Sequence, residues 1–347
     1  MYKLILFFIV LLLTRIDSVA QTQFKDFIIA DKYIWALTSD GRIMLFDTAN
    51  GKPASKQITN TSGIFVLATD AYGIPVIADS ANEIKRYNAE KKSWDVITNY
   101  SEKLYGLIFN KKNSCYAITQ NGIADMRTKQ VYFPQDTAIF YRKTWSKVPV
   151  YMIDKSDNIW VGFGFGEWGG AIYVFNTREE KYIDTLWNNS EFSVSPVKSF
   201  FEDSIAVYFT SGLSHMFVVS GSISKYENQK FRTIFYNTSE YSKDGKFKLE
   251  KEGEYIGPGA YNSFDHSIYF YSQHGIFKGD IKKDLSKFEN WINVIETKLK
   301  WGWGQSDATG PPMNVTKLSI IDKDKFAILT EKDGIGLFDG ARMIMIQ

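Results

Sequence analysis

The side chains that could carry acid–base chemistry in this chain are few. Besides one cysteine, Cys115, there are three histidines, His215, His266 and His274. Histidine and glutamate are among the side chains that most often transfer protons in enzymes. By the strand pattern described below, His215, His274 and Glu167 follow the second strands of three successive repeats, so we expect them on one face. These three residues are the candidate catalytic groups of a lyase or hydrolase that acts on a polysaccharide or cyclic substrate.

A metal site at these residues is not expected. Equivalent positions on adjacent repeats lie on the order of 10 Å or more apart, whereas metal ligands bind at about 2 Å. The sequence contains no Gly-x-Ser-x-Gly or His-Glu-x-x-His motif of hydrolases. The turn at 154–158 also lacks the regularly spaced oxygen ligands of a calcium loop. We therefore expect no cofactor, and the question of enzyme activity stays open, with binding favoured.

Aromatic residues gather in two glycine-rich segments, and aromatic rings stack well on sugars and peptides. The first segment contains Phe163, Phe165 and Trp168 beside Glu167, and the second contains Trp301 and Trp303. In both segments the rings could instead pack against the neighbouring repeat. With the polar contacts added, the predicted ligand-binding residues are Phe163, Phe165, Glu167, Trp168, His215, His274, Trp301 and Trp303.

β-strands must position these residues, because apolar alternation with a period of two recurs through the chain and no long window shows the helical period. A unit of strand, acidic or amide turn and second strand returns seven times, which is typical of a propeller. The fourth unit divides into four strands, at 150–154, 159–163, 171–176 and 181–186. The sequence therefore predicts one all-β domain at 21–347, a seven-bladed β-propeller with four antiparallel strands per blade. The turns begin at Asp31, Asp70, Asn110, Asp154, Glu202-Asp203, Asp265 and Asp322.

Two long connections depart from the repeat, at 237–255 and 296–314. In a propeller such connections emerge on the same face as the turns between second and third strands, one of which is 164–170. Loops on a rigid scaffold commonly carry binding sites. We therefore expect a ligand or partner on the face that carries 163–170, 211–215 and the two long connections. The ring needs no covalent link to close if the segment from Gln23 to Phe27 pairs with the last blade, and the sequence does not give the register of such a pairing.

Residues 1–20 have the pattern of a bacterial secretory signal peptide. Lys3 precedes an apolar run from Leu4 to Leu13, and Ser18-Val19-Ala20 places small residues before Gln21. We expect a monomeric periplasmic or extracellular protein that is not inserted in the membrane after cleavage. The net charge of +2 gives no electrostatic reason to bind nucleic acid. A single cysteine excludes an internal disulfide.

One motif of the fourth repeat reads Asp154-Lys155-Ser156-Asp157-Asn158-Ile159-Trp160-Val161-Gly162 and continues with Gly169-Gly170-Ala171-Ile172-Tyr173-Val174-Phe175-Asn176. It resembles the repeat of the two-component regulator propeller family. Propellers of that family form extracytoplasmic sensor regions of bacterial histidine kinases, several of which respond to carbohydrate breakdown products. The resemblance implies a propeller fold and export, and a sensing role for a stand-alone propeller without a kinase. The predicted partner is a carbohydrate, a peptide or an envelope protein. If it is an envelope protein, the chain would be a structural interaction module in an envelope complex.

Overall fold

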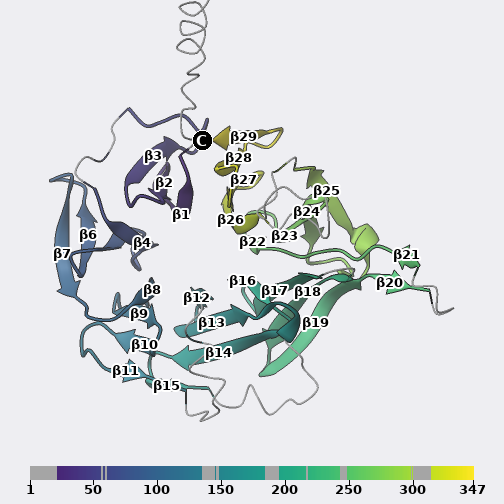
Figure 1. Cartoon of the computed structure of the whole chain (residues 1–347), viewed down its shortest axis with the longest axis horizontal. Coiled ribbons are helices and arrows are strands. Elements are labelled where there is room, and N and C mark those ends of the chain that lie inside the picture. The colour runs from purple at the N-terminus through teal and green to yellow at the C-terminus, as the bar shows by residue number, and fades with distance from the viewer. Residues whose placement is uncertain are drawn as a thin grey trace, which may run out of the picture.

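In the computed structural model, the chain forms a ring of seven β-sheets, or blades, around a central axis (Figure 1). The structure describes residues 22–55, 58, 61–134, 145, 148–183, 195–215, 218–242, 248–297, 299 and 314–347. The predicted signal peptide lies outside these ranges. No helix in them is long and apolar enough to span a membrane. The all-β, seven-bladed propeller that the strand pattern predicts is confirmed.

Each blade runs from an inner strand near the axis to an outer strand at the rim, with antiparallel pairing throughout. The first three blades contain β1 (Phe24–Ala30), β2 (Tyr33–Thr38) and β3 (Ile43–Asp47); β4 (Ile64–Thr69), β5 (Pro75–Asp79), β6 (Glu83–Asn88) and β7 (Ser93–Asn99); and β8 (Leu104–Phe109), β9 (Cys115–Thr119), β10 (Gly122–Asp125) and β11 (Val131–Tyr132). Blades 4 and 5 contain β12 (Val150–Ile153), β13 (Asn158–Gly164), β14 (Gly170–Asn176) and β15 (Lys181–Tyr182); and β16 (Val197–Glu202), β17 (Val207–His215), β18 (Val218–Glu227) and β19 (Lys230–Thr238). Blades 6 and 7 contain β22 (Gly259–Asn262), β23 (Ser267–Ser272), β24 (Gly275–Asp280) and β25 (Trp291–Ile295); and β26 (Val315–Asp322), β27 (Lys325–Thr330), β28 (Ile335–Phe338) and β29 (Met343–Ile346).

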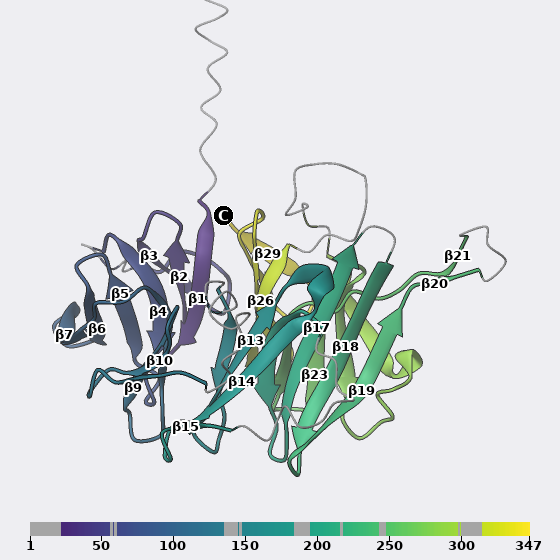
Figure 2. The same cartoon turned by 60° about the horizontal axis from the view of Figure 1, so that its bottom comes forward.

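The described residues contain three further short elements besides the strands of the blades. A hairpin of β20 (Glu240–Tyr241) and β21 (Leu249–Lys251) projects outward between blades 5 and 6 (Figure 2). The short helix η1 (Gly166–Trp168) lies in the turn between β13 and β14, on one face of the ring. The second short helix, η3 (Phe288–Asn290), precedes β25 at the outer rim. The long connection predicted at 237–255 is therefore partly an extended hairpin.

Blade 1 differs from the others because its fourth position holds no regular strand. The segment around Pro53 follows β3 with a single bridge between Phe46 and Pro53. Two backbone bonds flank this bridge, from Asp47 N to the Lys52 carbonyl and from Ala54 N to the Leu45 carbonyl. Proline has no N–H to donate to a ladder, which keeps the pairing short.

The ring is closed by side chains rather than by a shared strand. β1 pairs with β2 of its own blade, and blade 7 is complete with four strands of its own. The hypothesis that Gln23 to Phe27 pairs with the last blade is therefore wrong. Instead, Lys317 Nζ of β26 donates to Asp26 Oδ1 at 2.8 Å and to the Phe27 carbonyl at 2.6 Å. Phe24 and Phe27 also pack in one apolar cluster with residues of blade 7.

The apolar core is distributed over the seams between blades. Each blade is buried on both faces, and the described core residues form clusters that join neighbouring blades. In the seam between blades 4 and 5, for example, Trp160 of β13 packs with Val197 and Phe209. Aromatic side chains fill such wedge-shaped seams with few residues, because each buries a large apolar surface. The ring thus holds together by repeated pairwise packing.

Cys115 lies in the seam between blades 2 and 3 and is expected to be chemically inert in the folded protein. It is buried, and burial raises the pKa of its thiol to about 12. Only the thiolate reacts readily with disulfide reagents. At pH 8 the native protein should therefore react with Ellman's reagent at least about 100-fold more slowly than the urea-unfolded chain. Stoichiometric labelling of the native protein at the unfolded rate would contradict this placement.

The repeated acidic and amide residues are hairpin corners, as the sequence predicts. In four blades, the turn between the first and second strands begins with a residue whose side-chain oxygen accepts backbone N–H groups two to four residues further on. This is the usual bonding of Asp and Asn in turns. These acceptors are Asp70, Asn110, Asp154 and Asp203.

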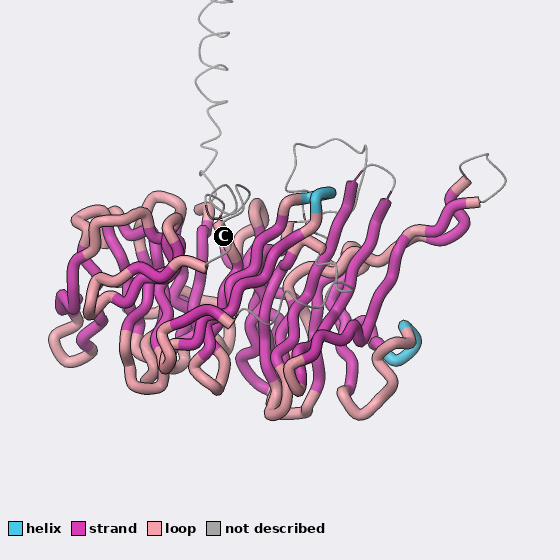
Figure 3. Tube along the Cα trace, turned by 90° about the horizontal axis from the view of Figure 1, so that it is seen from below, coloured by secondary structure: helices cyan, strands magenta, loops and turns pink. Residues whose placement is uncertain are grey.

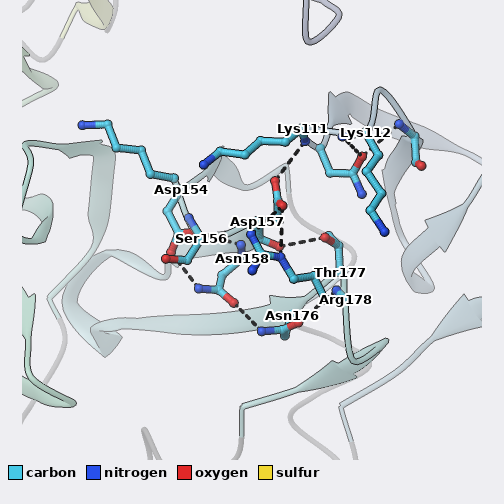
Figure 4. A network of polar contacts seen from close by, with 12 residues as sticks. Lys111, Lys112, Asp154, Ser156, Asp157, Asn158, Asn176, Thr177 and Arg178 are labelled. Carbon is cyan, nitrogen blue, oxygen red and sulfur yellow. Dashed lines mark hydrogen bonds and ion pairs between the residues drawn. The ribbon is translucent and has the colours of Figure 1, made fainter.

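The same corners also link one blade to the next, which the sequence analysis did not anticipate. The residue after the corner donates its N–H to a side chain at the corner of the following blade. Lys111 N donates to Asp157 Oδ1 at 2.9 Å, and Asp157 Oδ2 accepts from the Arg178 guanidinium (Figure 4). Equivalent bonds join Ala71 N to Asn113 Oδ1 and Lys155 N to Glu202 Oε2. The repeat therefore fixes both the shape of each corner and the contact between corners.

Candidate functional site

A pocket between blades 4 and 5 contains several of the residues that the sequence singled out. Its volume is about 370 Å³, and it opens between the η1 turn and the end of β17. The lining residues are Gly164, Phe165, Gly166, Glu167, Trp168, Pro196, Lys198, Gly212, Leu213, Ser214 and His215. The predicted turn at 164–170 and the predicted segment 211–215 therefore meet at one site, although they belong to different blades.

Glycine shapes the turn that carries the candidate residues. Gly166 and Gly169 have φ values of +64° and +86°, in the left-handed region that other residues rarely adopt. Between them the chain forms η1, which stands at one face of the ring (Figure 3). A Cβ on Gly170 would lie 2.5 Å from the Ser195 carbonyl oxygen, so the turn packs closely against the start of blade 5. This close approach brings η1 next to β17.

Two of the three aromatic residues in this turn are available to a ligand. Trp168 is 82% exposed at the tip of η1, and Phe165 is half-buried in the pocket wall. Phe163 is only 1% exposed and packs edge-on against Trp145 in the seam between blades 3 and 4. The prediction of an exposed ligand-binding ring is therefore wrong for Phe163. Its role is to support Phe165, whose ring lies nearly parallel to it at 6.3 Å.

Glu167 and His215 form a direct pair across the two blades. His215 Nδ1 lies 2.8 Å from Glu167 Oε2, and both side chains remain partly exposed. The separation of about 10 Å expected between equivalent positions on adjacent blades concerned shared metal ligands, and here two long side chains bridge neighbouring blades directly. η1 lengthens the turn of blade 4, and β17 and β18 are the long strands of blade 5, so both ends extend beyond the regular rim. The pair thus occupies a place where one ligand atom can contact both groups.

His274 belongs to a separate cluster. Its Nδ1 contacts both carboxylate oxygens of Glu254, at 3.1 and 3.2 Å, and no hydrogen bond or ion pair in the described residues joins it to Glu167 or His215. Burial raises the pKa of Glu254, and the His274 imidazole opposes part of that rise. The Ser272 hydroxyl donates to the same carboxylate. His274 is therefore oriented by a buried acid in blade 6 and does not complete the pocket.

The third histidine has a local partner, and two of the predicted residues lie outside the described part of the chain. His266 bonds the Tyr261 hydroxyl at 2.8 Å in a corner of blade 6. Trp301 and Trp303 fall within 300–313, outside the described residues. Among the residues that are described, no group of three or more His, Cys, Asp or Glu side chains could hold a metal ion.

Lys198 is a pocket residue that the sequence analysis missed. It lies on β16, the inner strand of blade 5, where its ammonium faces the Tyr255 ring at 5.5 Å. Burial lowers the pKa of Lys198, and the negative charge of Glu331 opposes part of that change. One signal in the sequence could have identified it, since Lys198 is a cation near the start of an inner strand that also holds Val197, Phe200 and Phe201.

Comparisons with known proteins support the fold of this chain. No protein-family model matches the sequence, and no curated protein matches it. Among solved structures, the β-propeller domain of Cps50 (Swd1) from Myceliophteria thermophila is similar, with a TM-score of 0.56 and 9% identity over 92% of this chain and 98% of that domain. Hydrazine synthase from Kuenenia stuttgartiensis gives a TM-score of 0.53 with 7% identity, over 92% of this chain and 96% of that chain. The computationally designed Ika8 protein gives a TM-score of 0.52 with 12% identity, over 94% of this chain and 86% of that chain. At these identities the likeness extends to the propeller architecture alone.

Proposed function

We propose that this chain is an exported bacterial propeller that binds a small carbohydrate or peptide in the pocket between blades 4 and 5. The observation that carries this proposal is the exposed Trp168, held on η1 beside the Glu167–His215 pair. A single exposed apolar side chain is common on protein surfaces, but Trp168 also lines a pocket together with a second ring, Phe165, and a polar pair. Its position over a pocket gives that exposure a use.

Binding would combine stacking with directed polar contacts. Trp168 and Phe165 offer ring faces to a sugar ring or an aromatic side chain, and such stacking favours flat, partly apolar ligands. Glu167 and His215 provide an acceptor and a donor in fixed positions, because each holds the other. Small-molecule sites commonly have this composition of apolar walls with a few convergent polar groups.

The resemblance of the fourth repeat to two-component regulator propellers agrees with this proposal. Several of the kinases that carry such propellers respond to carbohydrate breakdown products, and the pocket borders the repeat that carries the resemblance. The predicted signal peptide would place the pocket where such products occur. Membership of that family, the export and the sensing role remain parts of the proposal.

A pair of substitutions on opposite faces tests the proposal. We expect Trp168→Ala to weaken binding of any ligand found on a glycan or peptide array by about tenfold or more, because truncated tryptophan anchors commonly have effects of that size. Tyr72→Ala is the matched control, since Tyr72 is 74% exposed in the corner between β4 and β5. Equal binding by both variants and the unchanged protein would contradict a site at Trp168.

A second candidate function is acid–base catalysis at the same pocket. The observation that favours it is the 2.8 Å separation of Glu167 and His215, which is within reach of a shared substrate atom. If a bound polysaccharide is cleaved, Glu167→Gln should lower the turnover by about 100-fold or more while binding persists. Release of new chain ends is the readout. Glycans that bind but stay intact would leave binding as the function.

A further inference from the structure

We infer that Lys198 binds an anionic group, a carboxylate or a phosphate, on the ligand held in the pocket between blades 4 and 5. This inference rests on the proposed function and specifies the charge of the ligand. Lys198 lines the same pocket as Trp168 and the Glu167–His215 pair. An anion at Lys198 would therefore belong to a molecule whose ring lies against Trp168 or Phe165.

A bulge in β16 places Lys198 out of the regular ladder. Val197 pairs with Ser211 and Ser199 pairs with Thr210, so Lys198 is the extra residue between two consecutive pairs. Bulges re-aim a side chain and are frequent beside functional sites. Here the extra residue is the one that reaches the pocket.

The same bulge recurs on other inner strands, which indicates what it does. Four further strands, β1, β4, β8 and β26, each leave one residue unpaired at the matching position. These residues line two more pockets of the described structure. The bulge thus repeatedly directs a side chain of an inner strand into a pocket. The residues concerned are Lys25, Phe65, Tyr105 and Thr316.

The charge of Lys198 has no ion-pair partner among the described residues. Its ammonium lies over the Tyr255 ring, and the nearby carboxylate of Glu167 is engaged with His215. The negative charge of Glu331 acts on Lys198 without forming an ion pair with it. The partly buried cation therefore loses hydration and gains little in return. An anionic ligand group supplies the missing partner, and it gains a charge-assisted hydrogen bond that is stronger than a neutral one.

Lys25 provides a matched comparison on the equivalent bulge of blade 1. Its Nζ donates to the Phe65 carbonyl at 2.9 Å, and the residue is exposed. Both ammonium groups lie over an aromatic ring, but Lys25 has water and a protein acceptor as well. Removing the charge of Lys198 or of Lys25 changes the net charge of the protein equally. A change in ligand affinity that occurs only without the Lys198 charge is therefore an effect of the pocket.

The test compares two probes that differ at one substituent, which is charged in one probe and neutral in the other. 4-Nitrophenyl β-glucuronide carries a carboxylate where 4-nitrophenyl β-glucoside carries a hydroxymethyl group. By equilibrium dialysis at low salt, we expect the full chain to bind the glucuronide about tenfold more tightly than the glucoside. Lys198→Met should remove this preference, so that the two glycosides bind with similar affinity. Lys198→Arg should retain most of the preference, and Lys25→Met should retain all of it. 4-Nitrophenyl phosphate distinguishes a phosphate ligand from a carboxylate ligand.

The outcomes separate this inference from the proposed function. If both glycosides bind alike, or the preference survives in Lys198→Met, the inference about charge is wrong while ligand binding stands. If neither glycoside binds, the preference for an acidic over a neutral ligand is measured with acidic and neutral glycans on the array, for the unchanged protein and for Lys198→Met. If no array ligand depends on Trp168, the proposed function fails and this inference fails with it.

Discussion

Replacing Trp160 by alanine is expected to lower the free energy of unfolding by about 3 to 5 kcal/mol. Trp160 is 1% exposed and fills the seam between blades 4 and 5, with Tyr226 at 5.2 Å and Phe200 at 6.0 Å between ring centroids. Its Nε1 also donates to Asp154 Oδ2 at 2.9 Å, so the substitution removes both packing and a bond to the corner. Urea unfolding followed by circular dichroism measures the change.

Two further substitutions divide this effect. Trp160→Phe keeps much of the ring but loses the N–H, and the expected loss is about 1 to 3 kcal/mol because the Asp154 carboxylate then lacks one donor. Trp168→Ala, also in blade 4, removes an exposed ring, and its effect should stay within about 0.5 kcal/mol. A Trp160→Ala protein as stable as Trp168→Ala would contradict the assignment of Trp160 to the core. The small effect of Trp168→Ala also makes that variant a clean probe of binding.

Replacing Asp157 by alanine is expected to be the second most damaging change, with a loss of about 2 to 3 kcal/mol. Its carboxylate accepts from Lys111 N on blade 3 and from the Arg178 guanidinium, so alanine breaks the link between two corners (Figure 4). Asp157 also has a φ of +63°, which alanine adopts only at a cost. Thermal or urea unfolding of the variant reports the sum of these losses.

Asparagine and glycine variants separate the two causes. Asp157→Asn keeps an oxygen for Lys111 N and tolerates a left-handed backbone, so it should lose at most about 1 kcal/mol. Asp157→Gly relieves the backbone strain but still lacks the acceptor. The pair with Arg178 contributes little by itself, because that guanidinium is well exposed. If Asp157→Asn proved as unstable as Asp157→Ala, the charge rather than the corner link would be the main contribution.

Much of the fold follows from local rules that are visible in the sequence. Asp154 accepts backbone N–H groups two and four residues later, and this bonding needs only the corner residue and its neighbours. The first three strands of the fourth blade begin and end within one residue of their predicted bounds for the same reason, whereas the fourth, predicted at 181–186, is Lys181–Tyr182. The blade count follows because each copy of the repeat forms one sheet. Such features depend on short stretches of chain.

Exposure along a strand was harder to predict than the strand itself. Alternation in β13 places Phe163 with the seam to blade 3 and Trp160 with the seam to blade 5. Because both faces of a blade are buried, a period of two does not distinguish a ligand-facing side from a core-facing side. The sequence therefore predicts an exposed ring at Phe163, although this residue lies in the core. Only the turn beyond it, with Trp168, leaves the packed region.

The sequence by itself determined the ring and its corners, because these depend on strand periodicity and on turn residues that act locally. Tertiary structure alone decided the Glu167–His215 contact, the bulge at Lys198 and the closure of the ring by Lys317. Each of these depends on how two segments that are distant in the sequence meet across a seam or a ladder. Strand register and the packing of one blade on the next set such meetings, and neither is encoded in a single stretch of residues.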